Sequence, residues 1–359
     1  MSQSEESLSP AVSSAGFSTY AEAKLSLEET LSKYQTLNPD DDTKEFLEIC
    51  FKYLPPDGQI NLSEDVCGCY NKDGSLNHDE LRQLADSIDT GLLRPLLSKG
   101  GKTPPITPSP RLGFDDSVEN LVSLDFTTAS RNDQERLSRN CLRRDGYRCA
   151  ISKTWSSDHE FPPGAVTGIL QAAHILPFAI SSFSNEDGRE TTSKVWANIF
   201  RYFPSLESTL NIKPEDVNRE NNIIMMLAPL HVEFGLFHFV FETTSIPNRY
   251  RLKSFPRFSS VYALFLPHDR VVKFTTHEHD YDLPEPQYLQ LHAAIGNILY
   301  ASGHAERIEK LMRDLGGTGG LALSKDGSTN LGDLLSVSQL SLLASNSRPT
   351  DSKVQQQRA

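Results

Sequence analysis

Apolar residues recur every three or four positions in several stretches of the chain, a spacing that places them along one face of an α-helix. This pattern predicts helices over 19–37, 41–54, 78–97, 131–148, 191–203 and 284–317, the last of them broken near Gly303. Short runs rich in valine, tyrosine and phenylalanine predict strands instead. These runs lie at 148–152, 165–175, 240–244, 250–255, 261–267 and 270–276. The segment 220–237 starts extended, and Pro229 suits the first turn of a short helix within it.

The order of these elements predicts an α+β protein with a small all-α region before a mixed one. We expect 1–18, rich in serine and glutamate, to be disordered and a helical region to cover 19–98. Residues 99–111 hold prolines and glycines that suit a linker, and 112–315 form the mixed region. The tail 316–359 is expected to be largely disordered. Its leucine-rich part, 332–343, fits either a segment that docks on a protein partner or the end of a packed helix.

The formal net charge of −12 argues against a nucleic-acid surface over the whole chain, but one segment is basic. Residues 131–153 hold seven lysines and arginines against three acids. This segment is either a solvated helix face or a positive face that positions phosphates. The candidate nucleic-acid-binding residues are Arg139, Arg143, Arg144, Arg148 and Lys153.

The chain shows no pattern typical of export or membrane insertion. Its first residues lack a basic segment followed by an apolar one, so we expect no secretory signal. The apolar run 223–230 is far too short to span a bilayer. Five cysteines, an odd number, fit free thiols in a reducing compartment. We therefore expect an intracellular protein, in the nucleus or the cytoplasm, with no membrane partner.

His174 stands in the apolar stretch QAAHILPF, which contains Pro177. A buried imidazole must find hydrogen-bond partners or lose its charge, so this position has either a structural or a chemical role. Downstream, Asn222 precedes His231 by nine positions across an apolar strand-to-helix transition. Upstream stands the segment RRDGYRCAIS, which includes Cys149. We expect His174, Asn222 and His231 to lie together in the folded chain.

This ordered set of motifs resembles the HNH endonucleases, whose core is a ββα-metal finger. The matching residues are Arg144, Asp145, Gly146, Cys149, His174, Pro177, Asn222 and His231. The variant is similar to one common in fungal proteins of unknown role, and the resemblance covers roughly 130–315. It implies an HNH-type ββα-metal core with a long helical insertion, extra strands and a C-terminal helix.

The resemblance also implies a reaction and the residues for it. A neutral imidazole can deprotonate water while one divalent metal ion, Mg²⁺ or Mn²⁺, neutralises charge on the leaving oxygen. His174 is then the general base, Asn222 fixes the geometry of the site and His231 is a metal ligand. Glu233 and His238 are further candidate ligands, although His238 also suits packing in its apolar run. The substrate is then a nucleic acid, with DNA favoured over RNA.

Two departures from the family pattern bear on this expectation. Many members have an acidic metal ligand directly before the first histidine, where this chain has Ala173. Others hold a structural zinc with two Cys-x-x-Cys pairs, which here read Cys149 with Ser152 and Leu227 with Leu230. A lone thiolate cannot close a tetrahedral zinc site, so we expect no structural zinc and apolar packing in its place.

Two functions are therefore open from the sequence. The first is a metal-dependent HNH endonuclease that hydrolyses phosphodiesters with His174 as base. The alternative is a catalytically degenerate HNH scaffold that acts as a nucleic-acid or protein binding module. A carboxylate such as Glu233 facing His174 would favour the first, and a pocket filled with side chains would favour the second. A scaffold protein that acts through its tail would need no active site.

Overall fold

The computed structural model describes residues 17, 19–97, 105–124, 131–181, 183, 185–278 and 280–316, and every structural statement concerns these residues. The predicted disordered ends, the docking segment 332–343 and the first part of the predicted linker lie outside them. The chain folds into helices and small sheets, which confirms the α+β class. None of the described helices is both long and apolar enough to cross a membrane.

The N-terminal region is a set of helices whose apolar faces meet. They are α1 (Tyr20–Ser32), α2 (Thr43–Tyr53), α3 (Pro56–Cys67), α4 (His78–Ile88), the π-helical turn η1 (Asp89–Leu93) and α5 (Arg94–Leu97). The sequence pattern predicts α1, α2 and α4 but misses α3. Pro56 starts α3, and Leu62 and Val66 are its large apolar residues in the core. Two such positions make too weak a periodic signal to predict a helix.

The central part of the chain contains two pairs of strands and a long helical insertion. β1 (Trp155–Ser156) pairs in parallel with β2 (Thr167–Gly168), and β3 (Leu170–His174) pairs antiparallel with β4 (Ile223–Leu227). α10 (Ala228–Gly235) follows β4 directly, with Pro229 in its first turn as predicted. The helices before and between these strands are α6 (Phe114–Ser123), α7 (Arg131–Arg144), η2 (Phe178–Ser181), α8 (Glu186–Tyr202), α9 (Ser205–Ser208), η3 (Pro214–Asn218) and η4 (Glu220–Asn222).

A three-stranded antiparallel sheet and two helices complete the fold. The strands lie in the order β5 (Phe239–Thr243), β6 (Arg249–Ser254) and β7 (Val271–Lys273). α11 (Pro286–Ala301) and α12 (His304–Gly316) follow, and the break between them falls at Gly303 as predicted. Gly303 has a φ of 73°, in the left-handed region where a glycine ends a helix without strain.

Two of the predicted strands are wrong. Residues 148–152 form a turn, within which Arg148 makes an isolated bridge to Trp155. Residues 261–267 largely form the 3₁₀-helix η5 (Ser260–Phe265). The segment pairs with none of the strands of the β5–β6–β7 sheet. It lies on the surface instead, with Leu264 87% exposed.

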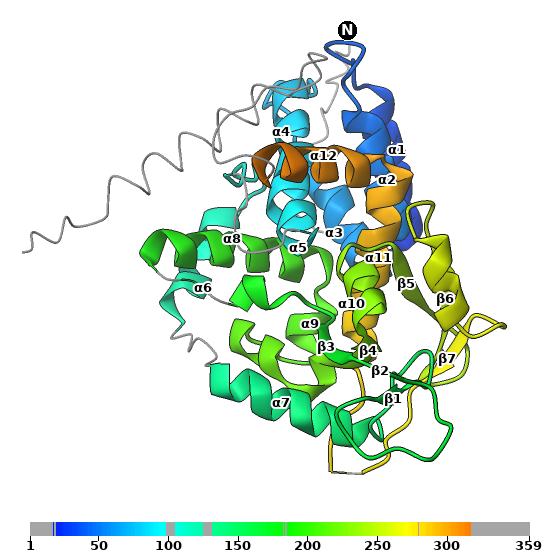
Figure 1. The fold of residues 1–359 in the computed structure, drawn as a ribbon. Helices are drawn as coiled ribbons and strands as arrows, with labels where there is room; N and C mark the ends of the chain where they lie inside the picture. The colour runs from blue at the N-terminus through cyan, green and yellow to red at the C-terminus, as the bar shows by residue number, and fades with distance from the viewer. Residues whose placement is uncertain are drawn as a thin grey trace, which may run out of the picture.

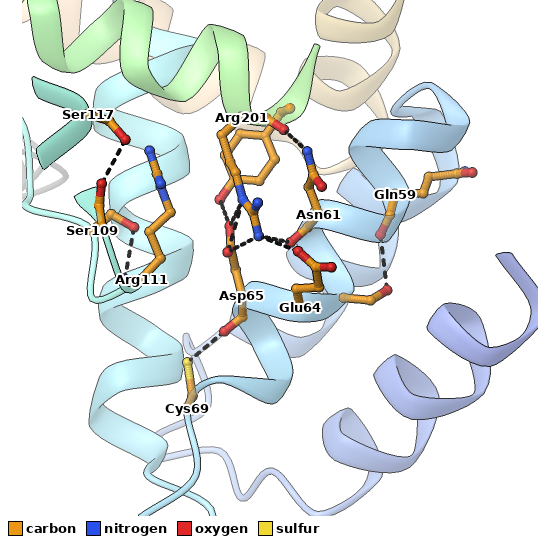
Figure 2. A network of polar contacts seen from close by, with 12 residues as sticks. Gln59, Asn61, Glu64, Asp65, Cys69, Ser109, Arg111, Ser117 and Arg201 are labelled. Atoms are coloured by element: carbon orange, nitrogen blue, oxygen red, sulfur yellow. Dashed lines mark hydrogen bonds and ion pairs between the residues drawn. The ribbon is translucent and has the colours of Figure 1, made fainter. Parts of the chain in front are cut away.

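The N-terminal helices pack directly on the central and C-terminal parts. α3 lies against α8, α2 lies against α11, and buried side chains from all three parts form a continuous hydrophobic core. In Figure 1, α12 lies beside α2, on whose Phe46 the ring of His304 stacks, while α7, β1 and β7 lie at the opposite end of the molecule. A polar network strengthens the joint, because Arg201 of α8 donates to Asp65 and Glu64 of α3 at 2.7 and 2.9 Å (Figure 2).

Candidate functional site

The antiparallel pairing of β3 with β4 brings three of the predicted site residues into one region. His174 ends β3 and lies opposite Ile223, the residue directly after Asn222. α10 packs against β3 and carries His231 in its first turn. His231 is close enough to His174 for its charge to affect the pKa of the latter. The structure therefore places His174 at a strand end, Asn222 before the paired strand and His231 on the following helix.

The side chain of Asn222 is fully buried and holds the chain that leaves β3. Its Nδ2 donates to the carbonyls of Leu176 and Val217, at 3.0 and 2.7 Å, and its Oδ1 accepts the amide of Leu176 at 2.8 Å. Its backbone carbonyl accepts the amide of Ile175 at 2.9 Å. These bonds fix the backbone directly after His174. Asn222 is thus placed to position His174 and is enclosed too deeply to touch a substrate.

His174 lies in a partly buried position beside η3. Its Nε2 is enclosed and has no hydrogen-bond partner among the described residues, and the same holds for Oδ1 of the neighbouring Asn218. Burial, and then the charge of His231, lowers the pKa of His174 to about 4, while Asn218 opposes this shift. His174 is therefore neutral near pH 7, the state in which an imidazole can accept a proton.

His231 contacts a residue that sequence analysis does not single out. Its Nδ1 lies 2.7 Å from Oε1 of Gln171, an oxygen that can only accept, so Nδ1 donates in this contact. Gln171 and Ala173 lie two residues apart on β3, so both side chains point to the face that α10 covers. Ala173 is fully buried there. Because alternate residues of a strand point to the same face, the sequence could have shown that Gln171 shares a face with Ala173, the residue before His174.

Glu233 and His238 belong to a different cluster. Oε2 of Glu233 lies 2.9 Å from Nδ1 of His238 and accepts the amide of Ser259 at 3.2 Å. Nε2 of His238 lies 3.4 Å from Oε1 of Glu309 in α12, which also pairs with Arg257. The carboxylate of Glu233 is engaged in this network under α12, and the structure does not bring it to His174.

The residues around His231 fit the divalent metal ion of the family poorly. In the part of the chain that the structure describes, no three His, Cys, Asp or Glu side chains come together as a metal site. Mg²⁺ prefers oxygen ligands in near-ideal octahedral geometry, whereas Mn²⁺ accepts imidazole more readily. The described contacts of His231 supply the amide of Gln171, and the fully buried Ala173 supplies no carboxylate. The described residues thus offer no cluster of carboxylate and imidazole ligands for either ion.

The positions of the family's zinc ligands are occupied mainly by packing residues. Leu227 and Leu230 are buried in the main hydrophobic core, together with Cys149. The sulfur of Cys149 accepts a long hydrogen bond, 3.4 Å, from the amide of Ser152. That the protein holds no structural zinc stays a prediction, which elemental analysis of the purified protein can check. A stoichiometric zinc that resists dialysis would contradict it.

Four of the five predicted nucleic-acid-binding residues are exposed, namely Arg139, Arg143, Arg148 and Lys153. Arg139 and Arg143 lie one turn apart on α7. Arg148 lies over the ring of Trp155, with 3.9 Å between its guanidinium carbon and the ring centroid. Within the described residues none of the four forms an ion pair with a carboxylate. Their charges are therefore available to an anionic ligand.

The structure corrects the place of Arg144 in that set. Its guanidinium is fully buried and pairs with Asp145, with 2.7 Å between Nε and Oδ1. It also donates to three backbone carbonyls, those of Glu220, Ile223 and Asp282. A guanidinium enclosed in this way cannot reach a phosphate. Arg144 instead ties the end of α7 to the segments that precede β4 and α11.

Comparison with known families agrees with this arrangement. A family model described as HNH endonuclease matches residues 149–242. The matched segment runs from the turn at Cys149 into β5 and includes β3, β4 and α10. Over these residues the chain is similar to HNH endonucleases, which confirms the resemblance inferred from its motifs. No curated protein and no solved structure matches the chain.

Proposed function

We propose that the chain binds nucleic acid through an HNH scaffold and lacks efficient metal-dependent hydrolysis. In this proposal β3, β4 and α10 are the two strands and the helix of the ββα finger, and α8 and α9 belong to the insertion between the strands. One observation carries the proposal: β3, β4 and α10 bring His174, Asn222 and His231 into one region, and the described residues form no group of three His, Cys, Asp or Glu side chains there. A site with this arrangement and no such group among the described residues favours the degenerate binding module.

The exposed cations beside this scaffold support nucleic acid as the partner. Arg139 and Arg143 on α7, with Arg148 and Lys153 in the turn that follows, lie directly before or within the segment similar to HNH endonucleases. Contacts of such side chains with phosphates supply affinity that is independent of sequence and falls as salt increases. We propose DNA ahead of RNA on the family resemblance alone.

One observation favours hydrolysis of phosphodiesters as a second candidate function. His174 is neutral near pH 7, and its enclosed Nε2 has no partner among the residues described. A neutral imidazole can take a proton from a water molecule next to a phosphate once a local rearrangement opens its enclosed nitrogen to solvent. The described residues around His231 fit the metal ion of the family poorly, so His174 is the group that supports this second candidate.

A nicking assay on supercoiled DNA separates the two candidates. We expect wild-type protein to nick weakly or not at all in Mg²⁺, with Mn²⁺ more effective and EDTA as the blank. Ala173→Asp places a carboxylate on the face of β3 that meets α10; because Ala173 is fully buried, the folding of this variant is checked by circular dichroism, and the folded variant should raise nicking in Mg²⁺. His174→Ala is the matched control, since it removes the base. Efficient nicking by wild type that His174→Ala abolishes would establish hydrolysis and overturn the proposal.

Binding is tested separately by fluorescence anisotropy with labelled DNA at several salt concentrations. We expect affinity to fall steeply with salt, and the double variant Arg139→Glu, Arg143→Glu to bind about tenfold more weakly or worse. Lys24→Glu, on an exposed position of α1 far from α7, is the matched control and should bind as wild type does. No binding of duplex or single-stranded DNA at low salt would refute the proposed function.

We also propose that the protein works in a reducing intracellular compartment, either the nucleus or the cytoplasm. All five cysteines are free thiols, and four of them are buried, in positions where they pack as small apolar side chains. Localisation of the tagged full-length chain by fluorescence microscopy would distinguish the two compartments, and secretion of the chain would contradict both.

A further inference from the structure

A groove of about 760 Å³ opens between the β1–β2 pair and the segment that runs from η5 to β7. Its volume lies within the range of roughly 300–1,000 Å³ that is typical of ligand sites. The walls are mainly apolar and include Trp155, Val166, Phe265 and Val272. Figure 1 shows β1, β2 and β7 together at the end of the molecule where α7 ends. The groove is separate from His174, which does not line it.

The charges at this groove have one sign. Lys153 and Lys273 line it, and Arg148 lies over the ring of Trp155. Lys273 is exposed on β7 and forms no ion pair with any residue that the structure describes. No aspartate or glutamate lines the groove. In a chain with a formal net charge of −12, this local excess of cations beside apolar walls favours an anionic partner with an apolar part.

The apolar walls contain two partly exposed aromatic rings, Trp155 from β1 and Phe265 from η5. Arg148 lies 3.9 Å from the centroid of the Trp155 ring, which holds the indole in place. Nucleobases stack on aromatic side chains whatever their sequence, and neighbouring cations hold the phosphates between them. The groove thus combines the two elements that proteins use to bind unpaired nucleotides.

We propose that this groove receives an unstacked base of a single-stranded nucleic acid, with the flanking phosphates held by Arg148, Lys153 and Lys273. The inference rests on the proposed nucleic-acid-binding function, and it names the substrate class as single-stranded or locally unpaired nucleic acid. Base stacking in a duplex hides the faces that Trp155 and Phe265 would contact. An apolar peptide would fill the same walls, but it would leave the three cations without a ligand of opposite charge.

The tryptophans of the chain allow a direct measurement. The chain has two, and Trp196 is fully buried whereas Trp155 is partly exposed at the groove. Quenching of intrinsic fluorescence by a bound base therefore reports on Trp155. We expect a single-stranded DNA of about ten nucleotides to quench this fluorescence and to bind at least about fivefold tighter than the duplex of the same sequence.

Two variants test the groove itself. Trp155→Ala should weaken binding of the single strand by about 5- to 100-fold, the range found for loss of one stacking platform. Trp155→Phe keeps an aromatic ring and should retain most of the affinity, which a general folding defect would not allow. Lys273→Glu, at an exposed position, should weaken binding of the single strand about tenfold. Lys24→Glu makes the same change of charge on α1 and should have no effect.

Three outcomes would overturn the inference. Equal binding of single strand and duplex, unchanged in Trp155→Ala and Lys273→Glu, would exclude the groove while leaving the proposed function intact. No binding of either form would remove the proposed function as well. Quenching by a synthetic peptide with the sequence of 332–343, without quenching by DNA, would assign the groove to a protein segment.

Discussion

Buried polar side chains hold the backbone around His174 in place. Arg144 pairs with Asp145, whose Oδ2 also accepts the amide of Met225 in β4 at 3.2 Å. Asn222 makes three side-chain hydrogen bonds to backbone groups next to the end of β3 and η3. Removing one partner from such a set leaves the others buried and unsatisfied, which costs more than the bond itself contributes. Both residues should therefore affect stability directly.

Replacement of the buried arginine gives a prediction about stability. We expect Arg144→Met to lower the free energy of unfolding by about 3–5 kcal/mol, because Asp145 loses its charge partner in a buried position. Urea unfolding followed by circular dichroism measures this change. Arg139→Met, one turn earlier and exposed, should change the free energy of unfolding by no more than about 0.5 kcal/mol. Equal effects of the two variants would show that Arg144 is not enclosed as described.

The adjacent asparagines give a matched pair for a second prediction. Asn222→Ala leaves two carbonyls and one amide without partners, so we expect the free energy of unfolding to fall by about 2–3 kcal/mol. Oδ1 of Asn221 has no described partner, and Asn221→Ala should have a clearly smaller effect in the same urea titration. The reverse order would assign the positioning role to Asn221.

At the scale of elements, His304 connects α12 to the N-terminal helices through hydrogen bonds. Its Nδ1 lies 3.1 Å from Asp89 of η1, and its Nε2 lies 3.3 Å from Asp42 at the start of α2. Arg307 of α12 also contacts Asp42, and Arg94 pairs with Asp89 at 2.6 Å. Burial by itself lowers the pKa of His304, but the hydrogen bonds to the two aspartates outweigh burial and raise this pKa.

The docking of α12 should therefore depend on pH. The stabilisation from charged His304 is fully present below the pKa of an unfolded histidine, about 6.5, and is lost as pH rises through the raised pKa of the folded state. We expect the free energy of unfolding to fall as pH increases above about 6.5. His304→Gln cannot titrate and should lack this part of the fall. Equal slopes for wild type and variant between about pH 6.5 and 8 would contradict the prediction.

Two other histidines also change the free energy of unfolding with pH, but only below about pH 6.5. Burial, the main cause in both cases, lowers the pKa of His174 to about 4 and that of His292 to about 3. A folded-state pKa below the unfolded value lowers stability as pH falls below about 6.5, which is the opposite sign to His304. The range above about 6.5 therefore isolates His304 from these two groups.

At the scale of the whole molecule, a shared core joins the regions that the sequence divides. The division into 19–98 and 112–315 stays a prediction. α2 and α3 bury apolar side chains against α11 and α8, and Arg201 bonds to Asp65 across the joint (Figure 2). Buried surface of this kind couples the unfolding of the parts that share it.

We therefore expect one cooperative transition when the full chain is heated in a differential scanning calorimeter. Arg201→Met leaves Asp65 buried without its charge partner, so it should lower the midpoint of that single transition instead of splitting it. Two separate transitions in the wild-type chain, with Arg201→Met shifting only one of them, would support independent regions and contradict this prediction.

Local sequence patterns determined most of the helices, the extended segments that become β3 and β4, and the short helix after Pro229. They could do so because helical periodicity and the conformations of proline and glycine act within a few residues. The order of the motifs also determined the similarity to HNH endonucleases and the elements that carry His174, Asn222 and His231. The main local failures were the helices α3 and α6, which were not predicted, and the strands predicted over 148–152 and 261–267, which did not form.

Only the tertiary structure decided which polar residues are available for chemistry or binding. Arg144 and Arg139 look alike within one basic run, yet one is enclosed by carbonyls far along the chain and the other is exposed. Glu233 turns to His238 and not to His174, and the groove beside Trp155 needs a wall from β7. Burial and partner choice depend on how segments pack in space, in the case of Arg144 and Asp282 across 138 residues of sequence, and no local pattern contains that information.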